Sequence, residues 1–189
     1  MNKKYIITIL ILFLLRGLDL LLTYWYTPNL KSEYNPLVSI FGASWFGLVG
    51  TQFLFLLVIA FFGSFYFSRP AIIVSIPKLN FSDFIYCYFF GKLKPWPQRF
   101  FSIPNNMNAH LIFNGYMFIA VAGLVSSFAI VNNFLLIVDL VWYRQLLMVY
   151  YQQIFPLVFL GVILSAFFYF FVGEYKRYLS QASLRAESI

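Results

Sequence analysis

Two ionisable side chains of opposite charge, Arg16 and Asp19, lie near the middle of an apolar run from Tyr5 to Tyr26. Residues three apart share one face of a helix, so these two can form an ion pair, and Thr23 extends the same face by one turn. Ionisable groups at membrane depth cost about 2.5–3.5 kcal/mol each on insertion scales, and they usually face a protein interior or a water-filled cavity. The pattern predicts an intramembrane polar site. It serves either as an ion pair that orients and packs the helix or as a binding or proton-handling site.

The loop that follows this run, residues 27–36, carries a second group of polar side chains. Glu33 and Asn35 come directly before Pro36, and proline is well tolerated in the first turn of a helix. Both side chains are therefore expected near the positive end of the next helix dipole. One interpretation is a capped turn, and the other is a pocket shared with Asp19. The predicted binding residues are Arg16, Asp19, Thr23, Glu33 and Asn35.

The polar residues of the first apolar run and of the loop after it also resemble the sequence pattern of a protein family. Asp19, Thr23, the Thr-Pro-Asn-Leu step at 27–30 and the Glu-x-Asn-Pro step at 33–36 resemble a family of small, uncharacterised bacterial integral membrane proteins. Members of that family have Asp-x-x-x-Thr in the first span and Glu-x-Asn-Pro at the start of the second. The resemblance covers about residues 12–50 and implies a bacterial inner-membrane protein with a polar site. It implies no activity, and it assigns no role to Arg16.

Composition defines the class of protein. Of the 189 residues, 62% are hydrophobic and 10% are charged, whereas soluble domains average about 25% charged. With a mean hydropathy of +0.81, the chain is predicted to be an integral membrane protein whose surroundings are the lipid bilayer. A single cysteine, Cys87, allows no internal disulfide. The basic residues flank apolar runs and form no nucleic-acid motif, so nucleic acid is not expected as a partner.

Four apolar runs are each long enough to cross a bilayer, at about residues 5–26, 45–67, 109–131 and 154–172. They predict an all-α membrane bundle of four transmembrane helices, with interfacial helices, in one domain over residues 1–189. The first run is interpreted as an uncleaved signal anchor, because no small-x-small cleavage site follows it. Residues 134–152 are apolar enough to suggest a fifth span. Because they contain Asp139 and Arg144, we interpret them as an outer helix lying against the bilayer.

The positive charges predict the orientation. With both termini in the cytoplasm, ten of the lysines and arginines fall on the inner side and two, Lys31 and Arg144, on the outer side. This asymmetry favours a multi-pass protein of the cell membrane with an even number of spans. Basic residues and aromatic residues in the segment 81–101 also indicate contact with anionic lipid at the inner face. Small residues four apart, such as Ala122 and Ser126, favour close helix packing, either within the chain or with a second copy or another membrane protein.

Other polar residues are weaker candidates. His110 is the only histidine, and its position at the start of the third span favours an interfacial capping role over a metal site with Asp19 and Glu33. Asp139 and Arg144 could cover the Asp19 site, although a solvated helix face is the simpler interpretation. No metal site is predicted, and no cofactor can be assigned.

Three classes of function remain, in this order. The first is a membrane scaffold or accessory subunit. The second is a binder or transporter of a small ion or lipid headgroup, and the third is an intramembrane enzyme that uses Asp19 and Glu33. Convergence of these two carboxylates on one pocket would favour the second and third classes.

Overall fold

The computed structural model describes residues 2–30, 38, 41–69, 74, 76, 78–99 and 102–187. The regular elements in these ranges are the helices α1 (Lys3–Tyr26), α3 (Trp45–Phe67), α4 (Phe81–Phe90), α5 (Trp96–Arg99), α6 (Met107–Ile137) and α7 (Val141–Glu187). The helices α1, α3 and α6 and the segment Pro156–Gln181 of α7 are long and apolar enough to cross a membrane. The chain is therefore a multi-pass membrane protein, and the predicted all-α bundle of four spans is confirmed.

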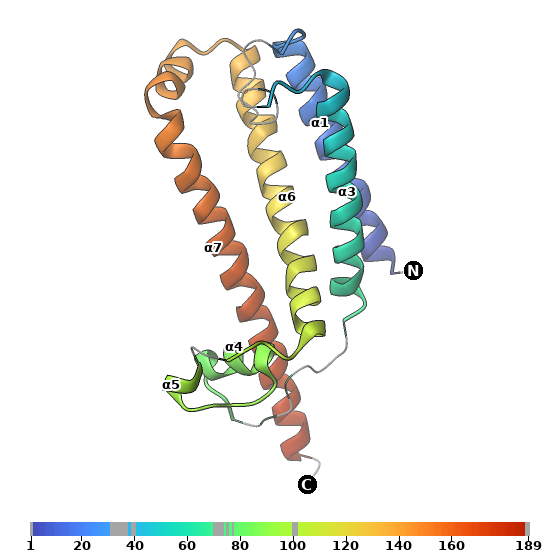
Figure 1. Ribbon diagram of the computed structural model, residues 1–189, viewed down its shortest axis with the longest axis vertical. Helices are drawn as coiled ribbons and strands as arrows, with labels where there is room; N and C mark the ends of the chain where they lie inside the picture. Colours follow the sequence, from blue (N-terminus) through green and yellow to red (C-terminus); the bar gives the residue numbers. More distant parts are fainter. Residues whose placement is uncertain are drawn as a thin grey trace.

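The four long helices form an upright bundle (Figure 1). We call the end where α1 and α6 finish the upper end, and the end where α6 begins the lower end, as Figure 1 draws them. The short helices α4 and α5 lie across the lower end. There α7 approaches α6, whereas toward the upper end the two helices diverge.

The helices of the first two predicted spans have nearly the bounds of the apolar runs, whereas the helices of the last two extend beyond them. Helix α6 continues past Val131 to Ile137, and α7 already begins at Val141. The interpretation of residues 134–152 as a separate interfacial helix was therefore wrong. These residues complete α6 and start the helix of the fourth span. The break between them lies at Asp139, which has a positive φ of 59°. Pro156 stands inside α7, where it removes one backbone hydrogen bond without ending the helix.

A close contact between α3 and α6 depends on glycine. A Cβ atom built on Gly115 of α6 would lie 2.2 Å from the carbonyl oxygen of Phe62 in α3. A Cβ atom built on Gly63 of α3 would lie 2.9 Å from Cδ1 of the Ile119 side chain in α6. Gly115 thus allows α3 and α6 to approach more closely than a residue with a side chain would permit, whereas a side chain at Gly63 would require only the end of the flexible Ile119 side chain to shift. This contact fixes α3 against α6.

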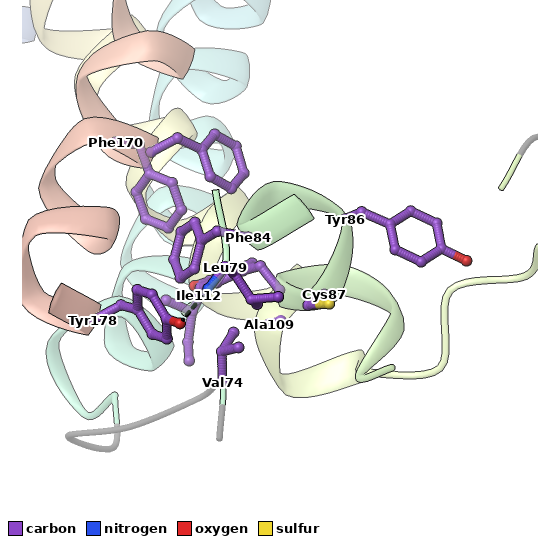
Figure 2. Close-up of a cluster of buried hydrophobic side chains, with 11 residues drawn as sticks. Val74, Leu79, Phe84, Tyr86, Cys87, Ala109, Ile112, Phe170 and Tyr178 are labelled. Carbon is purple, nitrogen blue, oxygen red and sulfur yellow. Dashed lines mark hydrogen bonds between the residues drawn. The ribbon is translucent and has the colours of Figure 1, made fainter. Parts of the chain in front are cut away.

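Aromatic side chains fill the lower end (Figure 2). Tyr88 of α4 is 1% exposed and packs against Phe170 and Phe171 of α7, and Phe84 is 2% exposed and packs against Tyr175 and Tyr178 of the same helix. Asn106 fastens this layer to α6, because it caps that helix at Ala109 and also donates to the carbonyl of Tyr88 at 3.1 Å. The segment 81–101 is therefore more than the surface anchor that the sequence suggested: its helix α4 is part of the core.

Candidate intramembrane binding site

Asp19 is joined to the opposite helix by an asparagine. The Asn133 side-chain nitrogen, on α6, donates to Asp19 Oδ1 at 3.1 Å and to Thr23 Oγ1 at 3.0 Å. An amide nitrogen carries two hydrogens, so it can make both bonds at once. Asn133 and Thr23 are buried at 9% and 7% exposure. Asp19 and Thr23 therefore share one face of α1, as predicted, and this face is held against the upper part of α6.

The network continues from Asn133 toward the start of α7. The Asn132 amide donates to Asn133 Oδ1 at 3.3 Å, and Tyr143 donates its hydroxyl to Asn132 Oδ1 at 2.6 Å. Each donor in this series points toward Asp19, whose carboxylate is its final acceptor. A phenol is protonated at neutral pH and can donate, and burial raises the pKa of Tyr143 above its ordinary value. The connected bonds tie three helices together at the upper end.

Arg16 contacts the second carboxylate oxygen of Asp19 and completes the site. Arg16 Nη1 lies 3.6 Å from Asp19 Oδ2, and the two side chains are 12% and 14% exposed. The predicted ion pair is therefore present and mostly buried. Among the described residues, Asp19 is the partner that the structure gives Arg16. A guanidinium has five N–H donors, so a single carboxylate at this distance leaves donors for another acceptor.

The same arginine borders a cavity of about 390 Å³ between the four long helices. Asn114 of α6 is the second polar side chain of its wall. The remaining wall is apolar and comes from α3, α6 and α7: Phe55, Met117, Phe118, Val121, Ala122, Val125, Phe159 and Ile163. Its volume lies within the range of small-molecule sites, which combine apolar walls with a few polar groups. Phe55 and Phe159 remain 45% and 40% exposed, so the cavity borders the lipid-facing surface of the bundle.

Of the five predicted binding residues, the structure brings three together. Arg16, Asp19 and Thr23 share one site, whereas Glu33 and Asn35 lie outside the described residues. Sequence reasoning missed Asn132, Asn133 and Asn114, because it searched the third span for charged residues. Two consecutive asparagines at the end of an apolar run were the available signal.

His110 takes no part in this site. It lies in the first turns of α6, about 34 Å along the helix axis from Asn133 at 1.5 Å per residue. Its ring stacks on Phe89 with centroids 4.6 Å apart, and Asn106 provides the helix cap instead. The predicted capping role was therefore wrong. Among the described residues, no group of three or more His, Cys, Asp or Glu side chains is placed to hold a metal ion.

Comparison of the chain with protein-family models, with curated proteins and with solved structures gave no match.

Proposed function

We propose that this membrane protein binds an amphipathic molecule with a long apolar chain and one anionic group, a carboxylate or a phosphate. One observation carries the proposal: a cavity with mainly apolar walls has a buried arginine at its border, and that arginine is held by Asp19. The apolar wall suits a hydrocarbon chain, and the guanidinium suits an oxyanion.

The site also has the rigidity that binding requires. Asp19 is fixed by Asn133 of the facing helix, and Asp19 in turn positions Arg16. A charged group oriented in advance loses less conformational entropy when a ligand arrives. The network thus explains why an acidic residue and a basic residue occur together in α1.

The role of a membrane scaffold or accessory subunit, which the sequence favoured, receives less support from this geometry. That role was inferred because Arg16 and Asp19 could pair α1 with another helix of the chain or with a partner protein. Asp19 already has its helix partner within the chain, through Asn133, and Arg16 borders a cavity that a pairing role does not require. The enzyme alternative needed Asp19 and Glu33 to converge, and Glu33 lies outside the described residues.

The ligand would reach the cavity from the bilayer. Phe55 and Phe159 line the cavity and are also exposed on the outside of the bundle, where lipid chains would lie. This arrangement supports capture of a lipid-like molecule in the plane of the membrane more than the passage of a small ion across it.

The charge asymmetry supports an orientation with the lower end and both termini in the cytoplasm. In this orientation Asp19, Thr23 and Asn133 lie in the outer half of the bilayer. The family resemblance supports placement in a bacterial inner membrane.

A bulky residue in the cavity tests the proposal. Val121 lines the cavity, and Val131 is 55% exposed on the same helix away from it. Val121→Trp should reduce binding of the fluorescent fatty acid cis-parinaric acid at least tenfold, and Val131→Trp should leave it unchanged. Equal binding by both variants and the original protein would overturn the proposal, as would equal loss in both.

A further inference from the structure

A second charged cluster lies at the lower end, far from Arg16. Glu174 of α7 is 7% exposed and accepts hydrogen bonds from two arginines. Arg69, just after α3, donates to it at 2.7 Å, and Arg177 donates to both of its oxygens at 2.9 and 3.1 Å. One carboxylate between two guanidinium groups leaves the cluster with a net charge of about +1.

Both arginines are held in place and still reach the surface. The Arg69 guanidinium lies over the ring of Tyr66, 4.3 Å from its centroid. The side chains of Arg69 and Arg177 are 24% and 35% exposed, whereas that of Glu174 is 8% exposed. The carboxylate thus lies beneath two cations that remain accessible to a ligand.

The same end of the bundle contains a buried hydroxyl group, that of Tyr88, for which the described residues provide no hydrogen-bond partner. Tyr88 is 1% exposed, and its hydroxyl makes no hydrogen bond to any described residue. Its ring packs against Phe170 and Phe171, one turn before Glu174 on α7. Burial is the main cause that raises the pKa of Tyr88, with smaller contributions from the charges of Glu174, Arg69 and Arg177. An unpaired buried hydroxyl costs about 1–3 kcal/mol, which an acceptor from outside the chain would recover.

We propose that Arg69 and Arg177, held on Glu174, bind a phosphate group at the lower end of the bundle and that the Tyr88 hydroxyl donates to it. Guanidinium groups and a hydroxyl donor match the oxygens of a phosphate, and the net positive charge favours an anion. The phosphate belongs either to a phospholipid headgroup or to a soluble phosphate. This site is separate from the cavity at Arg16 and does not depend on the function proposed there.

Three variants of the full chain test this site in a neutral detergent. Tyr88→Phe removes only the unpaired hydroxyl. Arg177→Gln removes one cation and leaves Glu174 paired with Arg69. Lys176→Gln is the matched control, because it removes one positive charge from an exposed neighbour. The probes are phosphatidylglycerol, diacylglycerol with the same chains, and inorganic phosphate, each titrated while the thermal midpoint of the protein is followed.

We expect phosphatidylglycerol to raise the thermal midpoint and diacylglycerol to leave it unchanged. Arg177→Gln should weaken the apparent affinity at least tenfold and Tyr88→Phe about fivefold, with Lys176→Gln equal to the original protein. A matching response to inorganic phosphate would identify a soluble phosphate as the ligand, and its absence a lipid headgroup. Without a ligand, Tyr88→Phe should melt no lower than the original protein, because the hydroxyl has no bond to lose.

Two outcomes would overturn the proposal. One is that Lys176→Gln weakens binding as much as Arg177→Gln, which would indicate general attraction to positive charge. The other is that Tyr88→Phe binds as well as the original protein or melts lower without a ligand, which would show that the hydroxyl serves the fold alone.

Discussion

The side chain of Asn133 donates a hydrogen bond to Asp19 across 114 residues of sequence, at 3.1 Å. This bond, with its companion to Thr23, joins α1 to α6 at the upper end of the bundle. It also fixes the carboxylate that holds Arg16 beside the cavity. Helix packing and the proposed binding site therefore depend on the same residue.

Replacing Asn133 should weaken the bundle. Asn133→Ala removes both bonds to α1, and interhelical hydrogen bonds in membranes contribute about 0.6 kcal/mol each on average, with a maximum near 1.7. We expect a loss of about 1–2 kcal/mol in the free energy of unfolding, measured in detergent. Tyr143→Phe is the control, since it removes only the bond to Asn132 and should cost less than half as much. An unchanged stability in Asn133→Ala would show that these bonds do not hold the helices.

Arg16 and Asp19 should be coupled energetically. Removing one partner of a buried ion pair costs about 3–5 kcal/mol, because the other charge stays buried without compensation. Asp19→Ala should therefore lower the thermal midpoint strongly. Arg16→Ala combined with Asp19→Ala should cost less than the sum of the single changes. Strict additivity in this double-mutant cycle would mean that the two groups do not interact.

The close crossing of α3 and α6 makes a third prediction. Gly115→Ala would place a methyl group against the Phe62 carbonyl, so the helices must separate and the protein should lose at least 2 kcal/mol of stability. Gly161→Ala in α7 has nothing within 4 Å of the new Cβ atom. It should be neutral or stabilise by up to about 1 kcal/mol, because alanine favours helix over glycine. Equal effects of the two changes would contradict this crossing.

The proposed orientation can be tested with single cysteines after Cys87 is replaced by alanine. Phe41 is exposed near the upper end, and Lys92 is exposed after α4 at the lower end. In intact cells, a membrane-impermeant thiol reagent should label Phe41→Cys and not Lys92→Cys, and both after lysis. Labelling of the two positions from the same side would exclude this orientation.

The four spans could be predicted from sequence because length and apolar composition alone determine whether a helix can cross a bilayer. Their ends were less predictable. Asp139 and Arg144 suggested an interfacial helix, although Asp139 marks only a short break between two long helices.

The candidate site could also be predicted only in part. Arg16, Asp19 and Thr23 could be placed on one face because helical spacing is a local property. Their partner Asn133 could not be predicted, because its contact with Asp19 and Thr23 depends on which face of α6 meets α1. The cavity depends on the packing of four helices, and no short stretch of sequence carries that information. The resemblance on Asp19, Thr23 and the 33–36 motif stays a prediction.

The most direct test of the account measures how Arg16 distinguishes a charged ligand from a neutral one. The dissociation constants of cis-parinaric acid and its methyl ester should be compared above the pKa of the acid. The original protein should prefer the acid, and Arg16→Gln should lose at least tenfold in affinity for the acid while binding the ester as before. The variant carrying both Arg16→Gln and Asp19→Asn, which leaves no buried charge unpaired, should show the same selective loss. Equal affinity of the original protein for the two ligands, or an equal loss for both in the variants, would contradict the account.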